Sequence, residues 1–388
     1  MRISLSFLTF LLLLTACQNV RVTNSPNGIE VSLQALVQEA VDDSLGDVPG
    51  VSMSVIAPRQ DIHWSGAAGF ADKTEKTVLS PAHPSRIASI TKTFVAAAIF
   101  RLYEMDSLQL DHSIVRYIST EHRDLLAADG YQVELITLRH CLFHTSGLYD
   151  FGVGGPAYLE AVSQNPKRRW SRTDQLRVAT EFGDPLWAPG GGFRYSDTGY
   201  ILLGEVIENL VDSTLAYGLR QLLNFETLGL AHTWMESLEP APFGVLPQVR
   251  RYYGRLDFTE WDNSIDLWGG GGLVATTEDV ASFVQALFTG QVFEKATTLS
   301  LFLEGPPAFP ASYPATKDPQ FMDYRSGHHA FELYGKPTLS HSGFWGTYYI
   351  FLPELEATVV VNYTANAKQR LLKKTALLLY ERSQQKAH

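Results

Sequence analysis

Ser89 and Lys92 form the pattern S-x-x-K where an apolar segment meets a strongly helical stretch. Residues three apart lie on one face of a helix, so a helix that begins here would place the lysine beside the serine hydroxyl. The helix dipole and the unpaired N–H groups of a helix start favour negative charge on that oxygen. If burial lowers the lysine pKa from about 10.4, the amine could accept the serine proton and create a nucleophile. The plainer alternative is an N-capping serine followed by a surface lysine; a second S-x-x-K, at 383–386, lies in a polar tail.

Two further groups of residues could take part in this chemistry. Tyr195 follows a Gly/Pro-rich turn and precedes Asp197 by two residues. A phenol can act as a base or an acid when nearby cations stabilise its anion. His341, Ser342 and Gly343 lie on an apparent strand, where the glycine would let a substrate backbone approach closely. The plainer alternatives are a buried tyrosine near a turn and a histidine at a strand end.

The elements that must position these side chains occur in a clear order. The pattern predicts helices over 31–45 and 91–105, and strands over 51–57 and 62–69. Strands return at 348–352 and 357–363, before a helix over 368–383, while the intervening signals are mostly helical, clearest at 137–145, 201–211 and 277–287. Strands at the two chain ends need partners, and a single antiparallel sheet satisfies both sets.

We therefore expect a two-lobed α+β fold: an antiparallel β-sheet flanked by helices, with an inserted, mostly helical lobe. The sheet lobe would comprise about 30–110 and 254–388, and the helical lobe about 111–253. The active site is expected at their junction, with Ser89 at a helix start.

The N-terminus has the features of a processing signal. Arg2 precedes an apolar stretch over 3–14, which is too short to span a bilayer. Leu14-Thr15-Ala16-Cys17 resembles the lipobox of bacterial lipoproteins. The resemblance implies a signal peptide at 1–16, a lipid on Cys17 and a tether over 17–29. Gln18 then points to the outer membrane, facing the periplasm; the alternative is an ordinary secretory signal.

The remaining cysteine would then have no disulfide partner. The chain has two cysteines, so lipidation of Cys17 leaves Cys141 alone. We expect Cys141 to be a small buried residue.

Five stretches in order resemble one protein family. They are RIASITKTF (86–94), ITLRHCLFHTSGL (136–148), PGGGFRYSDTGYILLGEVIE (189–208), GGGGLVATTEDVASFVQAL (269–287) and HSGFWGTYYIFLPE (341–354). The family comprises the serine β-lactamases, penicillin-binding proteins and related esterases and D-amino-acid peptidases, in its class C-like branch. Each stretch is modest alone, but all five in family order are highly specific. The resemblance covers most of the chain from about residue 48 and implies a β-lactamase/transpeptidase-like fold.

The resemblance also implies roles for individual residues. Ser89 would be the acylated nucleophile, Lys92 its proton partner, and Tyr195 the base or proton relay. The backbone N–H groups of Ser89 and Phe344 would form the oxyanion hole. His341 would line the pocket where many members place a lysine. The substrate-binding residues would be Asp197, His341, Ser342, Gly343 and Phe344.

Two departures from the family pattern bear on mechanism. Asp197 stands where penicillin-recognising members usually have asparagine; an amide can donate a hydrogen bond, while an ionised carboxylate only accepts. An ionised Asp197 near Lys92 would raise the lysine pKa. We therefore expect Lys92 to be a permanent cation and Tyr195 to do more of the base work. His341 replaces the lysine of the usual K-T-G and would be charged only in part at neutral pH, which disfavours β-lactamase activity.

These residues predict a serine hydrolase that acts through an acyl-enzyme on small esters, amides or D-amino-acid peptides. Alternatives are a β-lactamase or D-alanyl-D-alanine carboxypeptidase, a non-turnover penicillin-binding sensor, an acyltransferase, and a metal hydrolase. The last has only His140 and His144, four residues apart and without an H-E-x-x-H pattern. We expect no metal and no cofactor. A formal charge of −10 argues against a basic nucleic-acid-binding face.

Overall fold

The computed structural model describes residues 28–44, 47–152, 156–253, 256–306, 323–365 and 370–386. The predicted signal peptide, the lipidation site at Cys17 and most of the predicted tether lie outside these ranges. Within the described ranges, no helix is both long and apolar enough to cross a membrane.

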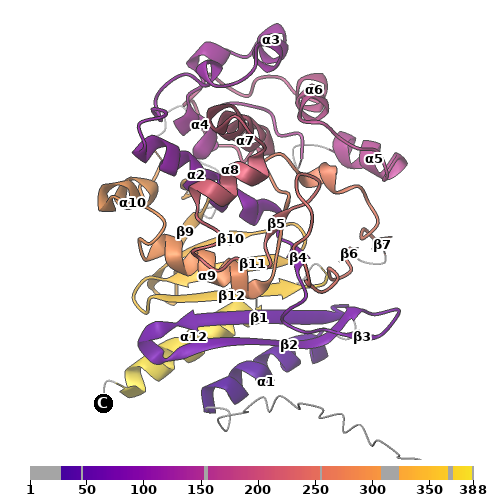
Figure 1. Cartoon of the computed structure of the whole chain (residues 1–388), viewed down its shortest axis with the longest axis vertical. Helices are drawn as coiled ribbons and strands as arrows, with labels where there is room; N and C mark the ends of the chain where they lie inside the picture. Colours follow the sequence, from indigo (N-terminus) through magenta and orange to yellow (C-terminus); the bar gives the residue numbers. More distant parts are fainter. Residues whose placement is uncertain are drawn as a thin grey trace, which may run out of the picture.

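A seven-stranded antiparallel sheet is built from both ends of the chain (Figure 1). Its strand order is β3-β2-β1-β12-β11-β10-β9, so the central pair joins an N-terminal to a C-terminal strand. Its strands are β1 (Gly50–Ala57), β2 (Ile62–Asp72), β3 (Thr77–Val78), β9 (His329–Leu333), β10 (Lys336–Ser342), β11 (Thr347–Leu352) and β12 (Ala357–Tyr363). In the central pair, Val51 lies opposite Tyr363. The predicted sheet from both chain ends is confirmed.

Helices cover both faces of this sheet. α1 (Gly28–Asp42) and α12 (Arg370–Lys386) lie on one face, and α9 (Thr277–Phe288) lies on the other. Successive side chains of a strand point to opposite faces. In β1, Met53 and Val55 accordingly join the core beneath α1 and α12, while Ser54 bonds Thr277 of α9 at 2.8 Å. The polar group on this buried face is therefore satisfied.

The second lobe is mostly helical and carries α2 (Thr91–Glu104) on its side toward the sheet (Figure 1). All of α2 except Tyr103 is buried, and the helix contacts α7, α8 and α10. A helix enclosed on all sides needs apolar residues all round, which its Phe-Val-Ala-Ala-Ala-Ile-Phe run supplies. The other α-helices are α3 (Thr120–Ala128), α4 (Leu138–Leu142), α5 (Pro156–Gln164), α6 (Arg172–Phe182), α7 (Asp197–Val211), α8 (Leu215–Leu222) and α10 (Ala296–Phe302).

Short elements connect the two lobes around the start of α2. A three-stranded sheet of β4 (Ser85–Arg86), β8 (Leu273–Ala275) and β5 (Trp234–Met235) leads into η2 (Ala88–Ile90), the turn before α2. The amide of Ile87 donates to the carbonyl of Leu273 at 3.0 Å, which holds this entry in place. The remaining short elements are β6 (Tyr252–Tyr253), β7 (Leu256–Asp257), η1 (Pro58–Gln60), η3 (Ile114–Arg116), η4 (Val133–Leu135) and η5 (Asn263–Asp266).

The helix predicted over 137–145 is shorter in the structure. Thr137 caps α4 by accepting the amide of His140, but the helix ends at Leu142. His144 then adopts a left-handed conformation with φ of 56°, which a continuing right-handed helix cannot contain. The chain turns here toward the site.

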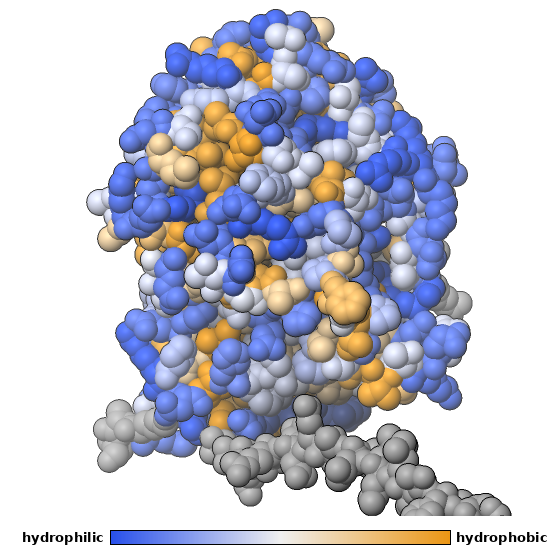
Figure 2. Space-filling model, in the orientation of Figure 1, coloured by the Kyte–Doolittle hydropathy of each residue, from blue (hydrophilic) through white to orange (hydrophobic). Residues whose placement is uncertain are grey.

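The surface is mostly polar. Figure 2 shows hydrophilic residues over most of one face, with apolar side chains gathered in separate patches. Phe243 is fully exposed, whereas Phe94 of α2 is completely buried and stacks on Phe283 with ring centroids 3.6 Å apart. The same substitution can therefore be compared at a buried phenylalanine, Phe94, and at an exposed one, Phe243.

We predict that Phe94→Ala lowers the free energy of unfolding by about 3–5 kcal/mol, because it removes buried contacts and leaves a cavity. The exposed control Phe243→Ala should change it by less than about 0.5 kcal/mol. Denaturant unfolding of both variants measures the difference. Equal effects would contradict the central place of α2 in the core.

Candidate active site

Ser89 lies in η2, two residues before α2 begins at Thr91. Its Oγ accepts a hydrogen bond from Nζ of Lys92 at 2.9 Å. No side-chain hydrogen bond caps α2, so the serine hydroxyl faces the lysine rather than serving as a helix cap. The structure thus brings the two predicted residues together, with Ser89 still partly exposed.

Lys92 is completely buried. Besides Ser89, its Nζ donates to the carbonyl of Gly270 at 2.5 Å and forms an ion pair with Asp197 Oδ1 at 2.5 Å. Three partners match the three N–H groups of an ammonium. Burial alone would lower the pKa of Lys92, but the charge of Asp197, followed by that of Tyr195, raises it above its ordinary value. Lys92 is therefore a cation at neutral pH.

Asp197 is the first residue of α7, and Tyr195 lies two residues before it. The Tyr195 phenol interacts with both Ser89 and Lys92, and Lys92 Nζ is 5.1 Å from the ring centroid. Burial raises the pKa of Tyr195 to about 12, although the Lys92 charge opposes this rise. The backbone N–H of Asp197 donates to Oδ1 of Asp150 at 2.8 Å. A carboxylate beneath the first turn thus fixes this end of α7.

His144 lies against Tyr195, with ring centroids 4.2 Å apart. Its Nδ1 accepts the backbone N–H of Ser196 at 3.1 Å, while its buried Nε2 has no hydrogen-bond partner among the described residues. Burial, followed by the charge of Lys92, holds the pKa of His144 well below its usual value. A neutral imidazole therefore supports both the ring and the backbone of the Tyr195 segment.

The histidine pair His140 and His144 makes backbone contacts. His140 Nδ1 accepts the amide of Thr137 at 3.1 Å. In the part of the chain that the structure describes, no three His, Cys, Asp or Glu side chains are placed to hold a metal ion. Cys141, between the two histidines, is completely buried as predicted, and burial raises its pKa to about 12.

His341 lies near Tyr195, with ring centroids 6.4 Å apart, but it does not carry the partial charge expected at neutral pH. It is only 3% exposed, and its Nε2 lies 3.1 Å from the Tyr324 hydroxyl. Burial, followed by the charge of His329, holds the pKa of His341 well below its usual value. His341 is thus a neutral interior side chain, because Tyr324, distant in sequence, covers it. This enclosure could not be read from the local pattern.

Directly after β10, the backbone at Gly343 packs against the backbone of the segment that carries Ser89. A Cβ on Gly343 would lie 2.2 Å from the carbonyl oxygen of Ile87, so only glycine fits. Ala88 has φ of +46°, a left-handed conformation that is unfavourable for alanine and must be held by its surroundings. Phe344 follows Gly343 as Ser89 follows Ala88, so the two amides predicted to form the oxyanion hole lie on adjoining segments. The side chains of Ser342 and Phe344 are exposed.

Other contributors were missed in the sequence. The 269–272 glycine run, quoted only as part of a family-like stretch, supplies the Gly270 carbonyl to Lys92. Asp266, not singled out, accepts the indole N–H of Trp345 at 3.0 Å, and a Cβ on Gly271 would collide with its carboxylate. Burial, followed by the negative charge of Asp197, raises the pKa of Asp266 to about 6. The four consecutive glycines were the available signal, since such a run permits close approach.

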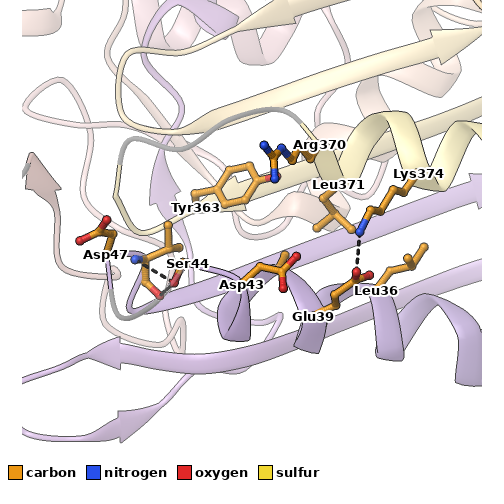
Figure 3. A pocket seen from close by; sticks show the side chains of 11 residues that line it. Leu36, Glu39, Asp43, Ser44, Asp47, Tyr363, Arg370, Leu371 and Lys374 are labelled. Carbon is orange, nitrogen blue, oxygen red and sulfur yellow. Dashed lines mark hydrogen bonds and ion pairs between the residues drawn. The ribbon is translucent and has the colours of Figure 1, made fainter.

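A separate surface groove lies between α1 and α12 (Figure 3). It has a volume of about 370 Å³, and an ion pair between Glu39 and Lys374 crosses it. These helices cover the face of the sheet opposite α9, and none of the site residues above lines the groove. The groove is therefore distinct from the Ser89 site.

We predict that the stability cost of ionising Asp266 appears as a pH dependence. Because its folded-state pKa lies above the ordinary 3.8, the folded protein binds this proton more tightly than the unfolded chain. The free energy of unfolding should therefore fall by up to about 3 kcal/mol as pH rises from about 4 to 7. Asp266→Asn, which cannot ionise, should lack this fall. Urea unfolding of both proteins measures it, and a difference independent of pH would contradict the raised pKa.

Comparisons with known proteins agree with this geometry. Residues 33–381 match the protein family described as Beta-lactamase. Penicillin-binding protein 4* of Bacillus subtilis is 26% identical over 347 residues, which cover 84% of this chain and 68% of that protein. Esterase EstB of Burkholderia gladioli is 30% identical over 218 residues, covering 55% of this chain and 54% of the esterase. The match thus spans about half of the esterase's length.

Solved structures show the same fold. The D-amino acid amidase of Ochrobactrum anthropi SV3 superposes with a TM-score of 0.74 at 23% identity, covering 92% of this chain and all of that one. A penicillin-binding protein of Bacillus halodurans gives a TM-score of 0.68 at 21% identity, covering 89% of this chain and 98% of that one. With the family match over nearly the whole described chain, these findings show that the protein belongs to the Beta-lactamase family and is a serine hydrolase of that family.

Proposed function

We propose that this enzyme hydrolyses small esters, amides or D-amino-acid peptides through a covalent acyl-enzyme on Ser89. The observation that carries the proposal is the 2.9 Å hydrogen bond between Ser89 Oγ and Nζ of the buried Lys92. Lys92 is in turn held by Asp197, and Tyr195 adjoins both Ser89 and Lys92. The esterase and the D-amino acid amidase among the similar proteins support these substrate classes.

In the acylation step, Ser89 Oγ attacks the substrate carbonyl carbon. Because its pKa of about 12 keeps Tyr195 a neutral phenol, it acts as a relay: its oxygen takes the Ser89 proton while it passes its own proton to the leaving group, and the Lys92 cation stabilises the negative charge that develops on the phenol oxygen. The oxygen of the tetrahedral intermediate accepts hydrogen bonds from the amides of Ser89 and Phe344. The carbonyl–leaving-group bond breaks, the alcohol or amine departs with the phenol's original proton, and Tyr195 is left protonated by the proton from Ser89.

Deacylation repeats these transfers with water. The water oxygen bonds to the acyl carbon, and Tyr195 takes a proton from this water while it passes its own proton to Ser89 Oγ. The ester bond to Ser89 breaks, its Oγ regains the proton, and the acid is released. Lys92 remains protonated throughout and acts as an electrostatic partner rather than as the base.

The site favours substrates that have no carboxylate, because neither Lys92 nor His341 offers a positive charge to bind one. Lys92 is buried and engaged by Ser89, Gly270 and Asp197, so it does not offer its charge to a ligand. His341 is neutral and enclosed. A β-lactamase or D-alanyl-D-alanine carboxypeptidase must hold a substrate carboxylate, and neither side chain supplies the cation. Esters and amides are therefore the preferred substrates.

For location, we propose a bacterial outer-membrane lipoprotein that faces the periplasm. The support is the lipobox-like Leu14-Thr15-Ala16-Cys17, with a lipid on Cys17 as the membrane contact and 17–29 as the tether. The expected binding partners are then a small-molecule or peptide substrate and the membrane, without nucleic acid.

The proposal is tested by intact-mass labelling of the full-length protein and its Ser89→Ala variant. A fluorophosphonate should add one phosphonyl group to the wild type and none to the variant. A penicillin should label the wild type slowly or not at all. One stable acyl group without turnover would instead identify a sensor, and absence of Ser89-dependent labelling by either reagent would overturn the proposal.

We predict that Asp197→Asn changes the basic limb of the pH–rate profile. Without the carboxylate, burial is no longer opposed by its charge, so the pKa of Lys92 should fall. Lys92 then loses its proton within the measured range, and activity in the basic limb should change at a lower pH than in the wild type. Ester hydrolysis measured from about pH 6 to 11 compares the two. Identical pH–rate profiles for the wild type and Asp197→Asn would contradict the assignment of Lys92 as a permanent cation.

A further inference from the structure

Arg251 is a buried arginine outside the residues assigned so far. It is 3% exposed, and among the described residues no carboxylate forms an ion pair with it. Its Nη1 donates to the carbonyl of Trp345 at 3.0 Å, and its Nη2 donates to the carbonyl of Arg86 at 3.4 Å. Its Nε has no hydrogen-bond partner among the same residues. Within the described ranges, the hydrogen bonds of this guanidinium therefore go to two backbone carbonyls.

Such a cation is costly to bury. A charge removed from water needs a counter-ion or a full set of hydrogen bonds, and the part of the chain that the structure describes gives Arg251 neither. Burial, followed by the charge of Arg86, lowers the pKa of Arg251 to about 9, which leaves it charged at neutral pH. An apolar side chain of similar length would avoid this cost. Stability therefore does not explain why a charged arginine occupies this buried position.

The two carbonyls belong to the segments that carry the predicted oxyanion hole. Arg86 is three residues before Ser89, and Trp345 directly follows Phe344. Arg251 thus connects the two segments whose amides must stay a fixed distance apart. A second hydrogen bond connects the same two segments: the Thr347 hydroxyl donates to the Arg86 carbonyl at 3.5 Å.

Trp345 is held from a second direction as well. Its indole N–H donates to Asp266 at 3.0 Å, and its ring joins a small buried cluster with Ala88 and Phe258. The segment after Gly343 is thereby fixed through both its backbone and its side chain. Arg251 supplies the backbone half of this restraint.

We propose that Arg251 is a positioning residue for acyl transfer. It fixes the separation of the Ser89 and Phe344 amides and keeps a positive charge beside the segments that carry them. The inference rests on the proposed function of Ser89. Oxyanion-hole donors act mainly in the transition state, so loss of Arg251 affects the rate of acylation more than substrate binding.

The test compares Arg251→Met and Arg251→Lys with the matched control Arg250→Met. Arg250 is the adjacent arginine, but its side chain pairs with Asp257 at 2.8 Å and with Asp72 at 3.7 Å, and it forms no ion pair with a residue of the site among those the structure describes. The readouts are the rate of fluorophosphonate labelling, and kcat and KM for a short-chain p-nitrophenyl ester. Circular dichroism confirms that each variant is folded.

For Arg251→Met we expect labelling rate and kcat to fall together by about tenfold to a thousandfold, the range for losing one oxyanion donor or its alignment, with KM changed by less than about threefold. Arg251→Lys keeps the charge but reaches one carbonyl, so its loss should be intermediate. Arg250→Met should stay within about twofold of wild type.

Wild-type rates in folded Arg251→Met would overturn the inference while leaving Ser89 as the nucleophile. A rise in KM at constant kcat would also overturn it, because that result indicates a role in substrate binding. If Arg251→Met does not fold, Arg251→Lys decides the matter by the same readouts, and failure of both to fold assigns Arg251 a purely structural role. Absence of wild-type labelling at Ser89 would contradict the proposed function itself.

Discussion

The ion pair between Lys92 and Asp197 is the interaction on which the site depends. A completely buried ammonium is stable only when its charge and all its N–H groups are satisfied. The partners come from three separate parts of the chain: Ser89 before α2, Asp197 at the start of α7, and Gly270 after η5. Satisfying Lys92 therefore fixes these three segments relative to one another. The catalytic geometry is a consequence of that requirement.

The same ion pair determines which groups can exchange protons. A cation held by a carboxylate is a poor base, but it favours the anion of a neighbouring phenol. Tyr195 is the group so placed, between Lys92 and Ser89. The imidazoles of His144 and His341 stay neutral because burial and the Lys92 charge both oppose their protonation. The cation that contacts the nucleophile is thus a side chain that does not titrate at neutral pH.

Much of this arrangement could be predicted from sequence. S-x-x-K at Ser89 and Lys92 specifies a local helical relation, and the alternation of apolar residues specifies the sheet strands at both ends of the chain. Asp197 near Lys92 followed from the family order of motifs. These features are either local or repeated along the chain, so they can be predicted from the sequence without knowledge of the fold.

What could not be predicted depends on contacts between distant segments. The enclosure of His341 by Tyr324, the bond between Asp266 and Trp345 and the position of Arg251 each need the folded chain. No local pattern distinguishes Arg251 from its neighbour Arg250, although one is buried and the other pairs with surface carboxylates. Charged residues are usually exposed, so the sequence alone predicts an exposed side chain for Arg251, which is in fact buried.

The central claim is the charge state of Lys92, and NMR titration measures it most directly. Protein labelled with ¹³C at the lysine ε-carbons gives one signal per lysine, and Lys92 is identified by its absence in Lys92→Arg. We predict that the Lys92 signal keeps the shift of a charged amine past the ordinary lysine pKa of about 10.4, and titrates at lower pH in Asp197→Asn. A wild-type signal that titrates near neutral pH would contradict the account and make Lys92 the base.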